Sequence, residues 1–541
     1  MPERTEGRRL FAGLDVSTQS CKLVVLDVDA GTILHVGRVE YDTDLPHFGT
    51  QGGTVPGLEA GVSESDPLMW IEAVELALIR AAEDSIPLSQ IRCISVSGQQ
   101  HGLVALTRNG ELARARSKLW NDVSTADECS TLTEAVGGPE AMIREVGNAQ
   151  RPGYTAGKIL HLRCNEPETY NRSHTLFLVH NFINWYLTGG PQRGVAVMEP
   201  GDTSGMALWH PGTGRWSRKV MDAIDPGLSE KLPHVHPSDR SIGTIAPRLA
   251  ERFGLSPGCR VDAGSGDNMY GAVGTGNFEP GILTVSLGTS GTAYTFLEDP
   301  FIDPLGEIAA FRDSTGHHLP LVCVSNLANG YDALLAEADL SHQEFSDLVL
   351  RTPPGAGGRV ILPWFQGERT PDLPDAAPLY FGFGVADLDP AYLCRALLEG
   401  HIMNLYEGVT RLPLDPTEVR VTGGLSKSPA WCQIIADVFQ AETVPVRGEG
   451  AALGAAVHAA WVWLRETGDG NTLADVAQPF VRLDEAGRRR ADPNAKADYA
   501  LLRRLFRALS QRVQGREGED PFLLRTQLRD AAIPPSRADD S

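Results

Sequence analysis

Two stretches of the chain, far apart in sequence, share one pattern of hydrophobic and polar positions. In each, an apolar run meets a short turn of small and hydroxylated residues and is followed by a second apolar run: FAGLDVSTQSCKLVVLDVD at 11–29 and GILTVSLGTSGTAYTFLED at 281–299. Runs rich in Leu and Val that are bounded by turn residues are typical of β-strands. The pattern therefore predicts a strand, a tight turn and a second strand at both places.

The same reading predicts further elements around these hairpins. GTILHVGRVEY at 31–41 continues the first hairpin as a third strand, and IRCISVSGQQHG at 91–102 is a buried strand that runs into a polar loop. Helical spacing after an Asp-Pro start predicts a helix over 65–85. Three later segments predict a helix, a strand–turn–helix unit and a helix of small residues suited to close packing: 176–190, 419–440 and 451–466.

The repeated hairpin plan predicts two related α/β halves, since no short internal period of about 20–50 residues is present. Glycine and proline cluster at 275–281, which places the boundary there. We expect an N-terminal domain at 10–278, a C-terminal domain at 279–513 and a polar, frayed extension at 514–541.

Composition limits the classes of protein to which this chain can belong. The chain has 541 residues, 42% of them hydrophobic, which suffices for more than one sizeable core. Its formal net charge of −21 repels phosphate backbones, so nucleic-acid binding is disfavoured. Eight cysteines occur without a CxxC pair, which favours free thiols in a reducing cytoplasm.

No signal peptide or membrane span is expected from the sequence. The first residues, MPERTEGRR, are charged and lead into a strand rather than an apolar signal segment. The longest apolar run, AALGAAVHAAWVWL, is short for a membrane span and is typical of a buried helix.

The two hairpin turns are candidate phosphate sites. A turn of Gly, Ser and Thr exposes backbone N–H groups and hydroxyls that suit phosphate oxygens. The candidates are Ser17 and Thr18 in the first turn and Gly288, Thr289, Ser290 and Gly291 in the second. Most such turns bind nothing, so the argument depends on their occurring as a pair.

Several common motifs are absent or incomplete. No GxxxxGK[ST] is present, and GSGDNM has Met269 where a dinucleotide-binding loop needs its third glycine. DTSG at 202–205 lacks a second motif to supply the partner carboxylate of an aspartic protease. The histidine pairs at 234–236 and 317–318 lack further ligands at metal-binding spacing.

Three motifs leave two interpretations open. Asp267 in GSGDNMYG could cap the following helix or accept the proton of an attacking hydroxyl, as phosphoryl transfer to an alcohol requires. Asp15 could form an Asx-turn or hold Mg²⁺, directly or through water. Gly423 and Gly424 could admit a ribose or a flat ring to the backbone, or form a plain turn that Ser428 caps.

The loop GQQH follows a buried strand and presents Gln99, Gln100 and His101. Three hydrogen-bonding side chains on one loop suit a polyol, although simple loop packing explains them equally well.

Taken in order, these segments resemble the FGGY carbohydrate kinases over roughly residues 10–513. The motifs that carry the resemblance are LDVSTQSCKLVVLD, SGQQHG, KLWNDVST, AGSGDN, VSLGTSGT, PWFQGERTP, RALLEG and VTGGLSKS. The resemblance implies an α/β fold with two actin-like, ribonuclease-H-like domains flanking an active-site cleft. Sugar would bind mainly to the N-terminal domain and ATP mainly to the C-terminal one.

The resemblance also implies roles for individual residues. Asp267 would be the general base, and Asp15 would lie near Mg²⁺ and the phosphates. The remaining residues fall into a sugar-contacting set, namely Gln100, His101, Asp202 and Asn268, and a nucleotide-contacting set, namely Ser17, Thr18, Gly288, Thr289, Gly423, Gly424 and Ser428.

DLPHFGTQGGT at 44–54 resembles the members that phosphorylate D-xylulose, so this ketose is the expected substrate. Another ketose or polyol is the alternative within the family, and a non-catalytic sugar-binding regulator is the alternative outside it. Three positions depart from patterns common in the family: His161, Asn181 and Ser428. We expect a cytoplasmic enzyme, and both a monomer and a homodimer remain open.

Overall fold

The structure is a computed structural model that describes residues 8–384, 389–448 and 450–531. The chain forms two compact units. Unit 1 contains the chain up to Pro280 together with Phe296–Pro320 and Gly448–Arg482. Unit 2 contains Gly281–Thr295, Leu321–Arg447 and the chain from Leu483 onward. The first crossing between units thus lies close to the boundary expected from the sequence, and two later segments of the chain return to unit 1.

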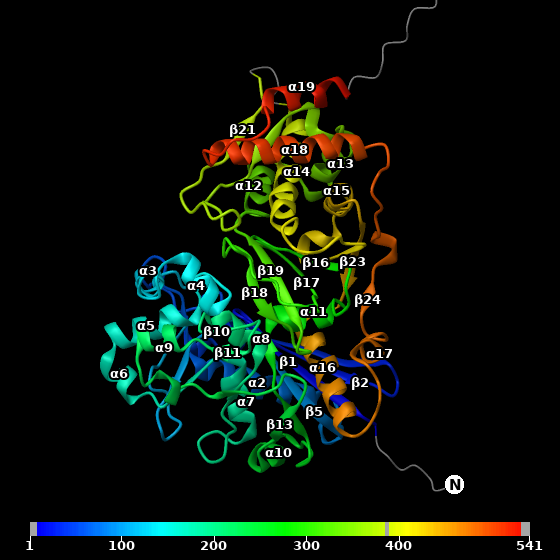
Figure 1. The fold of residues 1–541 in the computed structure, drawn as a ribbon. Coiled ribbons are helices and arrows are strands. Elements are labelled where there is room, and N and C mark those ends of the chain that lie inside the picture. Colours follow the sequence, from blue (N-terminus) through cyan, green and yellow to red (C-terminus); the bar gives the residue numbers. More distant parts are fainter. Residues whose placement is uncertain (1–7, 385–388, 449, 532–541) are drawn as a thin grey trace, which may run out of the picture. The chain divides into compact units, whose positions relative to one another are not determined.

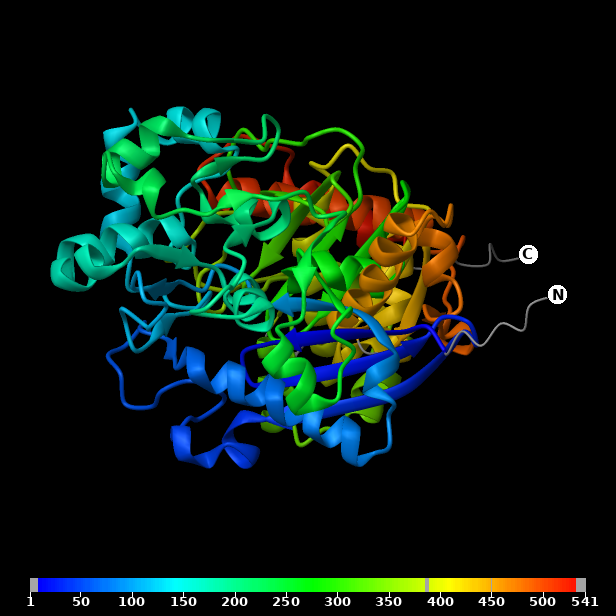
Figure 2. The same cartoon turned by 90° about the horizontal axis from the view of Figure 1, so that it is seen from below.

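A mixed sheet forms the centre of unit 1 (Figure 1), with strand order β13-β14-β5-β1-β2-β3. β1, β2 and β3 are antiparallel neighbours, and β5 and β14 add parallel strands. The first strands of the chain lie side by side, in blue, in Figure 2. The predicted hairpin, third strand and buried strand are therefore confirmed (Figure 2). The bounds are β1 Leu10–Val16, β2 Ser20–Asp27, β3 Thr32–Glu40, β5 Ile91–Gly98, β13 Ser241–Thr244 and β14 Arg260–Asp262.

Unit 2 repeats this plan in the order β19-β17-β16-β22-β23. β16, β17 and β19 are antiparallel neighbours, and β22 and β23 run parallel to β16. Each unit thus places an antiparallel hairpin beside parallel strands, which confirms the predicted pair of related α/β halves. The bounds are β16 Ile282–Leu287, β17 Gly291–Thr295, β19 His318–Val324, β22 Glu418–Thr422 and β23 Glu442–Arg447.

Helix α16 (Gly450–Glu466) belongs to unit 1, where it packs on β1, β5 and helix α11 (Asp267–Gly274). The packing is so close that side chains at the crossing would overlap the neighbouring backbone. A Cβ on Gly13 would lie 2.1 Å from the carbonyl oxygen of Ala452, and one on Gly454 would lie 1.8 Å from that of Tyr270. The expectation that this helix of small residues packs closely is confirmed.

Two further predictions need correction. The segment 176–190 was expected to be one helix, but strand β8 (Thr175–Phe177) precedes helix α7 (Val179–Thr188), because β8 pairs with β6 (Val104–Leu106). Such tertiary pairing overrides a local apolar pattern.

The extension after residue 513 also holds structure that its polar composition did not predict. Helix α19 (Pro521–Ala531) follows α18 (Lys496–Val513) and buries Leu524 and Leu528. Among the residues that the structure describes, no helix combines the length and the apolar character needed to cross a membrane.

Candidate active site

Asp267 is the first residue of α11 and follows Gly266, the N-cap. Its Oδ1 accepts hydrogen bonds from the backbone nitrogen of Asn268 at 2.8 Å and from the side-chain nitrogen of Asn268 at 3.0 Å. The N-cap residue, Gly266, makes no side-chain cap, and the contact of Asp267 with the first turn is the one to the N–H of Asn268. This contact is compatible with the capping interpretation, so the role of Asp267 depends on its other neighbours.

Two carboxylates from other segments of unit 1 act on the pKa of Asp267. The pKa of Asp267 is raised to about 8, first because burial disfavours its charge and then because the negative charges of Asp15 and Asp202 are near. A carboxylate whose pKa is shifted toward neutrality by burial and like charges is characteristic of acid–base sites. The structure thus brings together the predicted base, the predicted metal-associated acid and Asp202.

Asp15 lies in β1 opposite Ser97 of β5, whose hydroxyl donates to Oδ1 of Asp15 at 2.7 Å. Burial raises the pKa of Asp15, while the Ser97 hydrogen bond and the charge of Lys22 oppose the rise. The hydrogen bond crosses the sheet to a neighbouring strand, so the Asx-turn interpretation does not account for this carboxylate.

The loop after β5 and the start of α11 converge on Asp202, which lies in helix α8 (Pro200–Thr203). The Asn268 amide donates to Oε1 of Gln100 at 2.7 Å, and the Gln100 amide donates to Oδ1 of Asp202 at 3.4 Å. The backbone nitrogen of His101 donates to the same oxygen at 3.3 Å. All four residues of the predicted sugar-contacting set therefore lie in one hydrogen-bonded group.

Glu199 is a buried residue of this region that the sequence analysis missed. Its carboxylate caps α8 by accepting from the backbone nitrogens of Gly201 at 2.6 Å and Asp202 at 2.7 Å. It also accepts from Ser265 Oγ at 3.2 Å, and His180 Nε2 lies 3.4 Å from it. Glu199 therefore joins the Asp202 helix to the loop that leads to Asp267. The Glu-Pro pair before Gly-Asp was the available signal, because Pro is favoured at the first position of a helix.

Lys158, three residues before the departure at His161, was also missed. The Lys158 side chain is buried, and its nitrogen donates to the carbonyl oxygens of His101 at 2.7 Å and Gly153 at 2.6 Å. Burial lowers the pKa of Lys158 to about 7. His161 of that motif lies near Glu128, with Nδ1 2.8 Å from the carboxylate. Asn181, the second departure, makes a 2.8 Å contact with His180 Nε2 through its amide.

The hydroxyls of the turn between β1 and β2 form hydrogen bonds to other groups of unit 1. Ser17 Oγ donates to the carbonyl oxygen of Ser20 at 2.9 Å, and Thr18 Oγ1 donates to Gln99 Oε1 at 3.2 Å. The partly exposed indole of Trp120 donates to Thr18 Oγ1 at 3.0 Å. Trp120 lies in the KLWNDVST motif, and its contact with this turn is a further feature that the sequence analysis did not assign.

In unit 2 the two predicted nucleotide turns lie side by side. Gly288 and Thr289 are exposed between β16 and β17, and Gly423 follows β22, the parallel neighbour of β16. Gly423 has φ 90°, and a Cβ there would lie 2.4 Å from the carbonyl oxygen of Leu287. Around Gly424 the space is open, with no heavy atom within 4 Å of the position of a Cβ. Both turns thus offer exposed backbone to a ligand.

Ser428 precedes helix α15 (Pro429–Phe439) but does not cap it with its side chain. Its hydroxyl instead makes a 2.9 Å hydrogen bond with the hydroxyl of Ser346 in helix α13 (His342–Arg351). The plain capped turn, one of the two interpretations of this segment, is therefore not what the structure shows.

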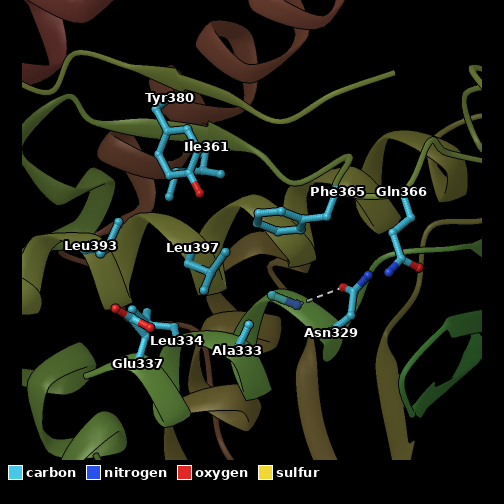
Figure 3. Close-up of a pocket in the computed structure, with 11 residues that line it drawn as sticks. Asn329, Ala333, Leu334, Glu337, Ile361, Phe365, Gln366, Tyr380, Leu393 and Leu397 are labelled. Carbon is cyan, nitrogen blue, oxygen red and sulfur yellow. Dashed lines mark hydrogen bonds between the residues drawn. The ribbon is translucent and has the colours of Figure 1, made fainter. Parts of the chain in front are cut away.

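A pocket of about 480 Å³ opens along helix α12 (Asn329–Glu337) of unit 2 (Figure 3). Its walls are mostly apolar, with the amides of Asn329 and Gln366 near one end and the carboxylate of Glu337 near the other. The residue before α12, Ala328, donates its backbone N–H to the carbonyl oxygen of Thr289 at 3.1 Å. The pocket and the Gly288–Thr289 turn therefore share the start of one helix, although none of the predicted site residues lines the pocket.

Comparison with known proteins shows the family to which this chain belongs. The models of the FGGY family of carbohydrate kinases match the chain over residues 10–274 for the N-terminal domain and 283–463 for the C-terminal domain. The chain therefore belongs to the FGGY family of carbohydrate kinases, a class whose two-domain α/β fold the structure shows.

Individual members of the family are similar to this chain over most of its length. The chain is 35% identical to the xylulose kinase of Haemophilus influenzae, over 88% of this chain and 94% of the relative. It is 30% identical to the xylulose kinase of Mus musculus, over 94% of this chain and 95% of the relative. Among solved structures, xylulose kinase from Bifidobacterium adolescentis is 26% identical and superposes with a TM-score of 0.76, covering 91% of this chain and 99% of that one.

Proposed function

We propose that this protein transfers the γ-phosphoryl group of ATP to D-xylulose, giving D-xylulose 5-phosphate and ADP. The observation that carries the proposal is the carboxylate of Asp267, whose pKa is raised to about 8, beside the group formed by Gln100, Asn268 and Asp202. Family membership supports the reaction class. The relatives named xylulose kinase support the choice of sugar.

The proposed chemistry assigns one task to each group of residues in unit 1. Asp267, once ionised, accepts the proton of the terminal hydroxyl as that oxygen attacks phosphorus. Asn268, Gln100, His101 and Asp202 offer donors and acceptors that orient the other hydroxyls. Orientation matters because it places the attacking oxygen in line with the leaving group before the reaction begins.

The predicted residues outside the sugar-contacting set suit the binding of Mg²⁺ and ATP. In the part of the chain that the structure describes, no cluster of three or more His, Cys, Asp or Glu side chains could hold a metal ion. A magnesium ion that takes one protein carboxylate and completes its shell with phosphate and water needs no such cluster. Asp15 offers that carboxylate, directly or through water, and a bound cation would offset the mutual repulsion that raises the pKa of Asp267.

For the nucleotide we propose the exposed turns of unit 2 at Gly288–Thr289 and Gly423–Gly424, with Ser428 after them, and the Ser17–Thr18 turn of unit 1. Backbone N–H groups in such turns bind phosphate oxygens. Magnesium-bound ATP supplies the phosphoryl group and neutralises the charge that develops during transfer. A cytoplasmic location stays a prediction.

ADP release in the presence of Mg-ATP tests the proposal, with a panel of ketoses and polyols and with two variants. We expect D-xylulose to give the highest kcat/KM, and Asp267→Ala to lower kcat by about 10²- to 10⁴-fold, the range for loss of a positioned base. Asp222→Ala removes a half-exposed carboxylate of unit 1 that pairs with Arg218 and should leave kcat unchanged.

Each other outcome has a definite meaning. Faster turnover on a different sugar would keep the mechanism and replace the substrate. Near-normal turnover of folded Asp267→Ala would remove this residue as the base. Absence of sugar-dependent ADP release from wild-type protein would favour a sugar-binding regulator instead.

A further inference from the structure

A fully buried cluster in unit 1 joins three segments that are distant in the sequence. The Nδ1 atom of His458, in α16, lies 2.8 Å from Oδ2 of Asp262 at the end of β14. The Nε2 atom lies 2.8 Å from the carbonyl oxygen of Ser314. One histidine thus connects the C-terminal, central and N-terminal parts of the unit.

The partners of His458 determine its charge. A neutral imidazole has one N–H donor, whereas the Asp262 carboxylate faces one ring nitrogen and the Ser314 carbonyl oxygen faces the other, so this arrangement favours the ring that carries both protons. Burial lowers the pKa of His458, but the charge and hydrogen bond of Asp262, together with the Ser314 carbonyl and Asp313, give a net rise. His458 and Asp262 therefore form a buried ion pair.

Asp262 in turn holds the chain on both sides of Asp267. Its Oδ1 accepts from the backbone nitrogen of Gly264 at 2.6 Å, in the turn that leads to Asp267. The same oxygen accepts from Ser95 Oγ at 2.8 Å, and that hydroxyl also lies 2.8 Å from the hydroxyl of Tyr270 in α11. The phenol oxygen of Tyr270 lies 3.2 Å from His458 Nδ1. The loop before Asp267 and the helix after it are therefore fastened to one ion pair.

We propose that His458 is a positioning residue for phosphoryl transfer: through Asp262 it fixes the segment 263–270 and so the carboxylate of Asp267. The inference rests on the proposed role of Asp267. It also gives α16 a task beyond packing, since the helix that closes unit 1 also sets the geometry of the catalytic loop.

Amide hydrogen exchange of the full-length protein tests the inference without relying on turnover. His458→Gln should speed exchange in 263–268 by about tenfold or more while exchange in β1 and β2 stays at the wild-type rate. His401→Gln is the matched control, because His401 is also fully buried but lies in unit 2, next to the carbonyl oxygen of Asn326. It should leave exchange in 263–268 unchanged.

Two further variants keep the inference falsifiable. Tyr270→Phe retains the ring and removes only the hydroxyl, so it should fold and still speed exchange in 263–268 measurably. The double variant Asp262→Asn with His458→Gln removes both charges, and it should recover part of the kcat that His458→Gln loses. We expect that loss to be about 10- to 100-fold, the scale for a misplaced catalytic group.

The outcomes separate the inference from the function on which it rests. Exchange in 263–268 at the wild-type rate in both His458→Gln and Tyr270→Phe would overturn the inference, as would a uniform rise across unit 1. Wild-type protein that shows no turnover on any sugar, but the expected exchange pattern, would overturn the proposed function and leave the positioning role of His458 standing.

Discussion

The side-chain nitrogen of Lys158 donates a 2.7 Å hydrogen bond to the carbonyl oxygen of His101. His101 has φ 64°, a left-handed conformation that is uncommon for residues other than glycine. Such backbone strain persists only where surrounding contacts hold it, and it clusters at functional sites. A long buried side chain from helix α5 (Thr155–Asn165) therefore maintains the loop that carries Gln100 and His101.

We predict that Lys158→Met raises KM for D-xylulose by about tenfold and lowers kcat less, since the base itself is untouched. The physical reason is that the His101 carbonyl loses its Lys158 donor at 2.7 Å and is left with the Thr155 hydroxyl at 3.3 Å, a loss of about 1 kcal/mol. Steady-state kinetics measure this. Lys231→Met is the matched control, because Lys231 also donates to backbone carbonyls in unit 1, those of Tyr170 and Ser173. Equal KM changes in the two variants would contradict a specific role.

The pH dependence of the reaction follows from Asp267. As the proposed general base it accepts a proton only when ionised, and burial together with Asp15 and Asp202 raises its pKa to about 8. We therefore predict that kcat/KM for D-xylulose, measured with both substrates below saturation, falls as the pH drops below about 8, by up to about tenfold per pH unit. A flat profile from about pH 6 to 8 would contradict the assignment.

The same pKa shift should make the folded protein less stable as the pH rises, whereas kcat/KM should increase. A carboxylate whose pKa is raised by folding destabilises the folded state progressively as the pH rises from its pKa in the unfolded chain, about 4, to its pKa in the folded protein, because the unfolded state ionises first. Asp267→Asn removes the charge with little change of shape. We predict that its free energy of unfolding rises relative to wild type as the pH passes from about 4 to 8, as denaturant unfolding at several pH values would measure. If the difference in free energy of unfolding between the variant and wild type does not vary with pH, folding does not raise the pKa of Asp267.

Adjacent glycines of unit 2 provide a test of the nucleotide turn. Gly424→Ala adds a Cβ where no heavy atom lies within 4 Å, so the stability of the free protein should change by less than about 0.5 kcal/mol. If the nucleotide passes this turn, the same methyl group meets the ligand, and KM for ATP should rise about fivefold or more. An unchanged KM for ATP in this variant would indicate that the nucleotide binds elsewhere, for example in the pocket along α12.

The contact between α11 and α16 gives a prediction about stability. Alanine is favoured over glycine by about 1 kcal/mol in a helix interior, yet a Cβ on Gly454 would lie 1.8 Å from the Tyr270 carbonyl oxygen. Overlap with rigid backbone outweighs helix propensity, so Gly454→Ala should lower the free energy of unfolding by about 2 kcal/mol or more. Gly470→Ala, where nothing lies within 4 Å, should change it little. Urea unfolding of both variants decides the point.

Local sequence patterns predicted both hairpins, the strands that begin 91–102 and 419–440, and the helix of small residues, because apolar periodicity and turn chemistry are short-range signals. They did not predict β8 or α19, since β8 depends on pairing with β6 and α19 on burying Leu524 and Leu528. The residues of the candidate site likewise fall into those that a local sequence signal marks and those that it does not. Glycine-rich motifs marked Asp267 and the Gly423–Gly424 turn, whereas Lys158, Glu199 and His458 act through carbonyl and carboxylate partners that are remote in sequence.

Unit 1 is assembled from the chain up to Pro280, Phe296–Pro320 and Gly448–Arg482, and this has a consequence for how the protein is made. A ribosome that has released the first 280 residues has produced a sheet whose Gly13 side still lacks the helix that covers it. Contacts between such distant segments slow folding and prolong exposure of apolar surface. The segment around Asp267 gains its contacts with α16 only after that helix is made, so we expect a nascent chain cut short before α16 to lack the completed unit 1.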